Sequence, residues 1–290
     1  MTVVAIRKRS IISYMSAGRV LDKYNRLKDI FAGTGPVLVA FSGGVDSTLL
    51  LKAASDILGH KVLAVTAVSS IRPVQEIEIA EETAKALNVK HLVIRSTELQ
   101  DEKVSGNSEQ RCYYCKKRRF SELKKIAERE GIAVVIEGSH INDADMYRPG
   151  EKAIDESGIR SPLKEAGLSK EEIRDISKQL GLSNWGRPSE SCLLTRFPYG
   201  VRIDAEALNR VQKAENILSE RGYREIRVRV YRDHVRVEVC PDQVDRLLTP
   251  EEKDLITEKF KDLGYTKTEI DPAGYRTGSM DEGISWTGKK

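Results

Sequence analysis

The repeated order of strand and helix patterns is the sequence feature that most constrains the fold. Strands are expected at 37–41, 62–65, 91–94 and 134–136, and helices between them at 47–58, 75–87 and 116–130. Strand, helix and strand in this order favour a parallel sheet with helices on both faces, so we predict an α/β fold. Ligands of such sheets bind at the carboxyl ends of the strands.

The pattern changes near Pro188. Alternation at period two in 224–231 and 235–239, on either side of a short turn, predicts an antiparallel hairpin. Helices expected at 205–221 and 250–263 and a strand at 266–270 complete a smaller α+β domain. We therefore divide the chain into a lead-in helix at 1–30, an α/β domain at 31–187, a linker at 188–203 and an α+β domain at 204–290.

Composition excludes several classes of protein. With 40% hydrophobic and 32% charged residues, the chain fits a globular protein, and its net charge of +4 is too small for a tail-driven nucleic-acid binder. No apolar run approaches the roughly 18 residues of a membrane span. Four cysteines are too few for a disulfide scaffold. We expect a cytoplasmic protein whose cysteines serve metal or thiol chemistry.

A glycine loop follows the first predicted strand directly. It consists of Ser42, Gly43, Gly44, Val45, Asp46, Ser47 and Thr48. Two glycines let backbone amides approach an anion, three hydroxyls can donate, and a helix amino terminus follows. A carboxylate at Asp46 beside polyphosphate is best explained as a Mg²⁺ ligand. The segment resembles the PP-loop of the ATP pyrophosphatase superfamily, which implies bound ATP and the release of pyrophosphate.

Three cysteines occupy the two remaining prominent motifs. Cys112 and Cys115 form a C-x-x-C pair, and Cys192 lies in the linker. Three thiolates can hold an iron–sulfur cluster with one metal open to an external sulfur ligand, whereas adding Cys240 would give four zinc ligands. Cys240 ends a predicted strand in the other domain, which favours a core role. The pair alone could also be redox-active or simply buried.

The combination of these motifs resembles the LarE family of ATP-dependent sulfur transferases. It comprises SGGVDST (42–48), CYYCKK (112–117), GSHINDADMYRPG (138–150), PSESCLLTRFPYG (188–200) and GYRTGSM (274–280). The resemblance implies that ring carboxylates of pyridinium-3,5-biscarboxylic acid mononucleotide are adenylated and converted to thiocarboxylates. The product leads to the nickel-pincer cofactor of lactate racemase. The resemblance also implies a homo-oligomer, either a trimer or a hexamer.

The source of the sulfur has alternatives at this stage. Cys192 corresponds to the cysteine that single-cysteine members of the family sacrifice as sulfur donor. Cys112 and Cys115 stand where those members lack thiols, so this chain looks like the members that bind a [4Fe-4S] cluster. We therefore expect sulfide or another external sulfur donor, with sacrifice of Cys192 or a persulfide as the alternatives.

Charged residues supply the other candidates. Lys116, Arg148 and Arg196 are the expected cations near the nucleotide and the sulfur, while Asp143 and Asp145 could assist Mg²⁺ or cap a turn. In the hairpin, Arg227, Arg229, Arg236 and Glu238 are expected to be exposed on one sheet face, where they could pair across the strands. The resemblance instead places Arg227, Arg229, Glu215 and Glu238 near the substrate phosphate and a neighbouring subunit. The four histidines form no ligand spacing.

These observations predict an enzyme that adenylates a carboxylate with Mg·ATP and then inserts sulfur. Two other functions fit parts of the sequence. A tRNA thiolase would share the PP-loop and the three cysteines, but the modest net charge is against it. A non-catalytic adenine-nucleotide scaffold would keep the loop without turnover.

Overall fold

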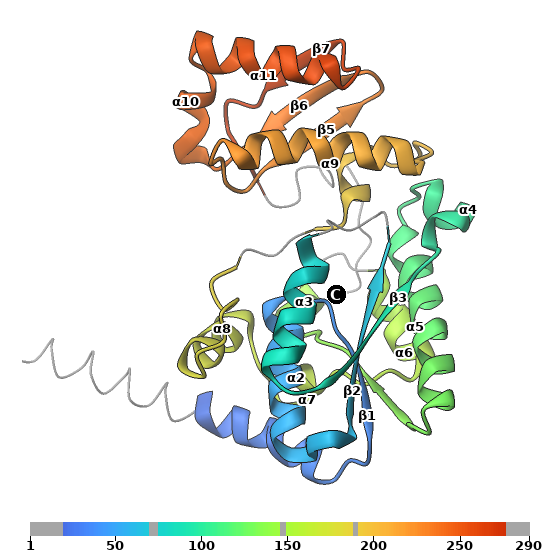
Figure 1. Cartoon of the computed structure of the whole chain (residues 1–290). Helices are drawn as coiled ribbons and strands as arrows, with labels where there is room; N and C mark the ends of the chain where they lie inside the picture. Colours follow the sequence, from blue (N-terminus) through green and yellow to red (C-terminus); the bar gives the residue numbers. More distant parts are fainter. Residues whose placement is uncertain (1–19, 70–74, 146–148, 188–190, 277–290) are drawn as a thin grey trace, which may run out of the picture. The chain divides into compact units, whose positions relative to one another are not determined.

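The computed structural model describes residues 20–69, 75–145, 149–187 and 191–276. These residues form two compact units (Figure 1). The first contains 20–68, 75–96 and 116–187, and the second contains Ser69, 97–115 and 191–276. Residues 97–115, which the sequence pattern assigned to the α/β domain, thus belong to the second unit and contact the rest of it. One of these contacts is a hydrogen bond from the Ile203 amide to the Ser105 carbonyl at 2.8 Å.

The first unit is built on a four-stranded parallel sheet in the order β3-β2-β1-β4. Its strands are β1 (Val37–Ala40), β2 (Val62–Val68), β3 (Lys90–Arg95) and β4 (Val134–Ile136). Its helices are residues 20–32, α2 (Val45–Leu58), α3 (Gln75–Ala86), most of α5 (Arg111–Arg129), α6 (Gly150–Ser157), α7 (Pro162–Glu165) and α8 (Lys170–Gln179). The predicted α/β fold is confirmed.

Alternate residues of the central strands enter two separate cores. Val37 and Val39 of β1 pack with α2, α3 and α8, while Leu38 packs with α5 and α6 on the other face. Because successive side chains of a strand point to opposite faces, a strand with both faces covered reads as a continuous apolar run. Figure 1 shows α2 and α3 on one side of the sheet and α5 on the other.

The second unit contains a three-stranded sheet in the order β5-β6-β7. The predicted hairpin is confirmed as β5 (Arg227–Tyr231) and β6 (His234–Glu238), which pair antiparallel, and β7 (Lys267–Ile270) adds a parallel strand. The helices of this unit are α4 (Glu102–Ser105), α9 (Ala205–Glu220), α10 (Val244–Leu247) and α11 (Pro250–Asp262). Val228, Val230, Val235 and Val237 pack with α9 and α11 in one buried core.

One helix begins earlier than predicted. The expected start near residue 116 is wrong, because α5 begins at Arg111 and carries both cysteines of the C-x-x-C pair in its first turns. Residues three apart lie on the same side of a helix, so Cys112 and Cys115 share a face. The boundary between the two units falls within α5, after Cys115.

Within the described residues, no helix combines the length and the apolar composition that crossing a membrane requires.

Candidate active site

The glycine loop follows β1, at the carboxyl end of a central strand, and its last four residues form the first turn of α2. Gly43 has φ +74°, a backbone conformation that side chains disfavour, and Gly44 caps α2 without a side-chain hydrogen bond. The first turn of a helix leaves backbone amides without partners, and the helix dipole adds positive charge there. The loop therefore has the geometry of an anion site.

Hydroxyl groups order the loop from inside. The Ser42 and Ser47 Oγ atoms lie 3.1 Å apart, and Ser47 Oγ donates to the Gly44 carbonyl at 3.1 Å. The loop after β4 packs closely against it, because a Cβ at Gly138 would lie 3.2 Å from the Ser47 amide nitrogen. A side chain at position 138 would be in tight contact with the backbone at the start of α2, which would have to shift by a few tenths of an ångström.

The base of the loop is held by a buried polar contact. The Thr66 hydroxyl donates to the Phe41 carbonyl at 2.9 Å and lies 2.7 Å from His91 Nε2. Burial lowers the pKa of His91, so the neutral ring is favoured in the folded protein. His91 thus supports the end of β1 through Thr66.

Asp46, the expected Mg²⁺ ligand, is paired with a lysine that the sequence analysis missed. Lys170 Nζ, at the start of α8, lies 2.7 and 2.5 Å from the two carboxylate oxygens of Asp46. Mg²⁺ typically takes one or two carboxylates together with substrate phosphates and waters, so a single Asp46 fits that ion. Nothing in the spacing of Lys170 relative to the loop, 124 residues away, signalled the contact.

Asn184 braces the same loop and was also missed. Its buried side-chain amide donates to the Gly43 carbonyl and to the Thr48 hydroxyl, both at 2.8 Å. These two bonds tie the loop to the residues that follow α8. Asparagine after a helix is usually a turn residue, so only the tertiary contact reveals this role.

Asn184→Ala is expected to weaken ATP binding about tenfold, because it leaves the two loop groups without their donor. Isothermal titration calorimetry of ATP binding measures the effect. Asn209→Ala, which changes an exposed asparagine of α9, is the matched control and should leave the affinity unchanged. Equal affinities of the two variants would contradict the bracing role.

The remaining nucleotide-side candidates are dispersed. Lys116 Nζ lies 4.0 Å from a Glu137 carboxylate oxygen at the end of β4. Asp143 is buried, and its carboxylate accepts a hydrogen bond from the His140 amide at 3.1 Å, which is a turn-capping contact. Arg148 lies outside the described residues, and so does the side chain of Asp145.

The sulfur-side cysteines all belong to the second unit. Cys112 is exposed, Cys115 and Cys192 are half-buried, and none of the three is in a disulfide. Cys115 and Cys192 pack against the same buried core. Over the described ranges, no three His, Cys, Asp or Glu side chains are grouped so that they could hold a metal ion, so these thiols are not assembled as a ligand set.

Cys240 differs chemically from the other three. A hydrogen bond to the Asp242 carboxylate, together with burial, raises the pKa of its thiol to about 11. A thiol that stays protonated is a poor nucleophile and a poor metal ligand. This supports a structural role for Cys240.

At pH 8, iodoacetamide is expected to modify exposed Cys112 while Cys240 stays unmodified until the pH approaches 11. Peptide mass spectrometry after timed alkylation measures both sites. Asp242→Asn removes the charge that keeps the thiol protonated, so alkylation of Cys240 should begin at lower pH. Equal alkylation rates at Cys112 and Cys240 at pH 8 would show that the Cys240 thiol is not kept protonated.

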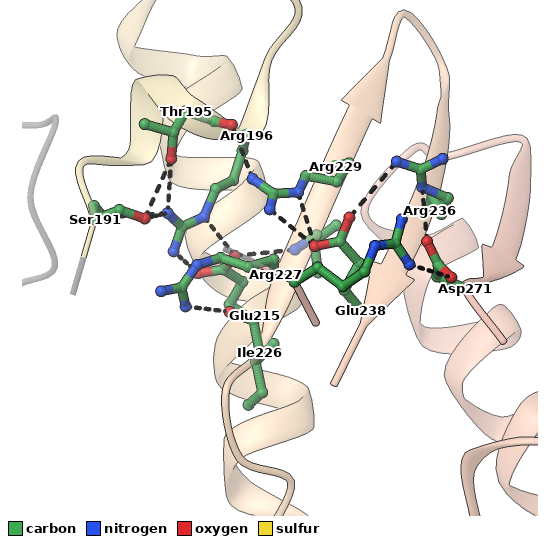
Figure 2. Close-up of polar contacts among 12 residues, drawn as sticks. Ser191, Thr195, Arg196, Glu215, Ile226, Arg227, Arg229, Arg236, Glu238 and Asp271 are labelled. Atoms are coloured by element: carbon green, nitrogen blue, oxygen red, sulfur yellow. Dashed lines mark hydrogen bonds and ion pairs between the residues drawn. The ribbon is translucent and has the colours of Figure 1, made fainter. Parts of the chain in front are cut away.

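Arg196 orders the segment that carries Cys192. Its guanidinium is bidentate to Glu215 at 2.8 and 3.0 Å, and its third nitrogen donates to Ser191 Oγ at 2.6 Å and Thr195 Oγ1 at 3.0 Å (Figure 2). The side chain is nearly inaccessible to solvent. Arg196 thus pins both sides of Cys192 to α9.

The hairpin charges are buried, so the expectation of exposed charges is wrong for three of them. Arg227, Arg229 and Glu238 are 8%, 4% and 0% exposed. Arg229 donates to Glu238 at 3.1 and 2.8 Å and to the Thr195 carbonyl at 3.0 Å (Figure 2). The 191–196 segment covers this face of the sheet, which sequence alternation alone cannot reveal.

Among the buried arginines Arg196, Arg227 and Arg229, Arg227 has the fewest hydrogen-bond and ion-pair partners in the described residues. Its Nη1 donates to the Ile226 carbonyl, and its guanidinium lies 4.9 Å from the centre of the Tyr275 ring. Burial and the nearby positive Arg196 lower its pKa. An anionic ligand would stabilise the charged form of this guanidinium, because its negative charge offsets the cost of burial and the repulsion from Arg196.

The structure therefore brings together Arg196, Glu215, Arg227, Arg229 and Glu238, and it places them beside Cys192. We call these five residues with Arg236 and Asp271 the arginine cluster. Arg236 lies 3.6 Å from both Glu238 and Asp271. Four guanidinium groups face three carboxylates, so the cluster keeps an excess of positive charge. The cluster adjoins the sulfur-bearing segment, and the glycine loop lies in the other unit.

Comparison with known proteins identifies the family of the chain. A PP-loop domain family matches residues 18–145. The chain is 35% identical over 250 residues to pyridinium-3,5-bisthiocarboxylic acid mononucleotide synthase of Lactiplantibacillus plantarum, covering 86% of this chain and 90% of that protein. It is also 37% identical over 260 residues to an uncharacterised protein of Synechocystis, covering 90% and 97%. A Methanocaldococcus jannaschii protein, also uncharacterised, is 32% identical over 259 residues, covering 89% and 98%.

The similarity to the L. plantarum synthase extends over both units, and so includes the glycine loop and the Cys192 segment. The chain therefore belongs to the LarE family of PP-loop, ATP-dependent sulfurtransferases.

Proposed function

We propose that this enzyme converts pyridinium-3,5-biscarboxylic acid mononucleotide into its thiocarboxylate form during synthesis of the nickel-pincer cofactor. The observation that carries the proposal is Cys192, which Arg196 holds within the arginine cluster of a PP-loop protein. The name of the L. plantarum relative supports the choice of substrate. A mononucleotide with two carboxylates is strongly anionic and suits a cluster with excess positive charge.

Adenylation comes first. A substrate carboxylate oxygen attacks the α-phosphorus of ATP, the bond to pyrophosphate breaks, and an acyl-adenylate forms. Amides and hydroxyls of residues 42–48 would bind the departing pyrophosphate at the start of α2. Asp46 would hold Mg²⁺, which supplies charge neutralisation on the phosphates when bound. Lys170, once separated from Asp46, has a free ammonium for a phosphate oxygen.

Sulfur transfer follows. A sulfur nucleophile attacks the acyl carbon, the bond to AMP breaks, and a thiocarboxylate is released with AMP. Cys112, Cys115 and Cys192 have the right chemistry for a [4Fe-4S] cluster, which would leave one iron open to an external sulfur ligand. Arg227 would bind the substrate phosphate, because its cation has no carboxylate partner within the described residues.

The test of the function uses the purified full-length enzyme with Mg·ATP, sulfide and the biscarboxylate mononucleotide. We expect pyrophosphate release and a product whose mass reflects exchange of oxygen for sulfur. A tRNA arm, in which tRNA replaces the mononucleotide, should give no thiolated nucleoside. Tight ATP binding without pyrophosphate release from any carboxylate would instead support a nucleotide scaffold.

The cluster is tested separately by anaerobic purification, iron analysis and absorption spectroscopy. Cys112→Ala with Cys115→Ala should lose the iron, and Cys240→Ala is the matched control that should retain it. Equal iron in all three proteins would remove the cluster. Loss of one sulfur and two hydrogens from the intact mass after turnover would instead identify Cys192 as a sacrificial donor.

The oligomeric state is a further part of the proposal. By resemblance to the family we expect a trimer or a hexamer. Size-exclusion chromatography with light scattering distinguishes these from a monomer.

A further inference from the structure

A buried asparagine ties the residues before the C-x-x-C pair to those after Cys192. Asn107 Nδ2 donates to the Phe197 carbonyl at 3.3 Å and to the Pro198 carbonyl at 2.8 Å. The Asn107 carbonyl in turn accepts from the Gly200 amide at 3.0 Å. One residue thus makes three hydrogen bonds to a segment about 90 positions away.

The backbone at Asn107 is committed to this contact. Its φ is +50°, in the left-handed region, and the residue is 0% exposed. Asparagine tolerates this conformation better than most side chains, and such a conformation persists where the surrounding contacts determine it. The contact is therefore part of the fold at this point and not a passing surface interaction.

Arg111 adds a charge to the same contact. Its Nη1 donates to Asn107 Oδ1 at 2.8 Å, and its guanidinium lies 4.3 Å from the centre of the Tyr199 ring. Arg111 is only 4% exposed, and no carboxylate in the described part of the chain pairs with it. A buried cation without a counter-ion is costly, so a nearby negative charge would stabilise it. Cys112 is the next residue in the chain.

We propose that Asn107, Arg111 and Tyr199 form a clamp that holds the Cys112–Cys115 turn in register with the Cys192 segment. These are positioning residues, and the role rests on the proposed use of the three thiols in sulfur transfer. The clamp brings two segments about 90 positions apart together when the protein folds, so the entropic cost of closing that loop is met during folding. Bringing the thiols together then requires only local movement.

Cross-linking of thiols in the metal-free, full-length protein tests the clamp without requiring turnover. In a Cys112→Ser background, a short bismaleimide should join Cys115 to Cys192, which border the same core. Asn107→Gly, which keeps the backbone conformation, and Arg111→Met should each lower the yield about tenfold, because the effective concentration of one thiol near the other falls. Arg111→Lys should give an intermediate yield.

The controls match the changes. Asn88→Gly alters an exposed asparagine that also has positive φ, and Arg202→Met alters an exposed arginine of the same segment as Tyr199. Neither should change the yield. The ATP affinity should be unchanged in every variant, because the glycine loop belongs to the other unit. If the clamp variants unfold, Tyr199→Leu is the milder test and should lower the yield roughly threefold.

A yield within twofold of the background protein in folded Asn107→Gly and Arg111→Met variants would overturn the clamp. Absence of any Cys115–Cys192 cross-link in the background protein would also overturn it. Failure of the proposed function would show as absence of pyrophosphate release and product in the wild-type enzyme, and it would leave the cross-linking result intact. The two failures are therefore distinguishable.

Discussion

Replacing Cys192 with alanine is expected to lower thiocarboxylate formation at least roughly 1,000-fold, because the variant loses the thiol on which sulfur transfer depends. Pyrophosphate release should persist, because adenylation needs the glycine loop of the first unit and not this thiol. Parallel assays of pyrophosphate and of product mass on one sample separate the two steps. We expect the variant to release pyrophosphate without forming the thiocarboxylate.

Two further variants complete this experiment. Asp46→Asn should lose pyrophosphate release and, with it, product, because the charge that would hold Mg²⁺ is removed. Cys240→Ser should behave as wild type, because the Cys240 thiol stays protonated at neutral pH. Product formation by Cys192→Ala within tenfold of wild type would exclude Cys192 from the chemistry.

Glu238→Ala is expected to destabilise the second unit by about 3–5 kcal/mol, because it removes the carboxylate that forms an ion pair with the buried Arg229 cation. The cost arises from the uncompensated charge and not from the pair's own stabilisation. Hydrogen exchange at the amides of β5 and β6, followed by mass spectrometry, measures the free energy of local opening. The first unit should be unaffected.

A matched exposed pair serves as the control. Glu206→Ala breaks the exposed pair with Arg210 on α9 and should cost less than about 1 kcal/mol. The double variant Arg229→Met, Glu238→Leu should recover most of the stability lost in Glu238→Ala, because it removes both charges. A cost for Glu238→Ala as small as that for Glu206→Ala would show that solvent reaches Arg229.

Local patterns predicted much of the fold. The apolar run of β1 predicted a strand covered on both faces, and the period-two alternation of 224–231 and 235–239 predicted the hairpin. The glycines and hydroxyls of 42–48 predicted an anion loop because their chemistry is contained in consecutive residues. These features depend on neighbours in sequence, so they are readable without the tertiary structure.

Contacts between distant segments were not predictable in the same way. Lys170 reaches Asp46 across 124 positions, and Asn184 reaches the Gly43 carbonyl across 141. The 97–115 segment joins the second unit although it lies between two strands of the first. No periodicity records which segments meet, so only the fold revealed the residues that brace the loop.

The hairpin arginines combine a side-chain direction that follows from the sequence with a burial that follows from the tertiary structure. The sequence by itself determined the strands, the turn and the face on which Arg227, Arg229 and Glu238 project, because side-chain direction in a strand follows from its period. Whether that face met water was decided by the tertiary structure, in which the 191–196 segment lies over the arginines. Burial depends on which segments from elsewhere in the chain pack over a residue. Because the 191–196 segment packs over this face, the charges form a buried cluster beside Cys192 and do not remain on the surface.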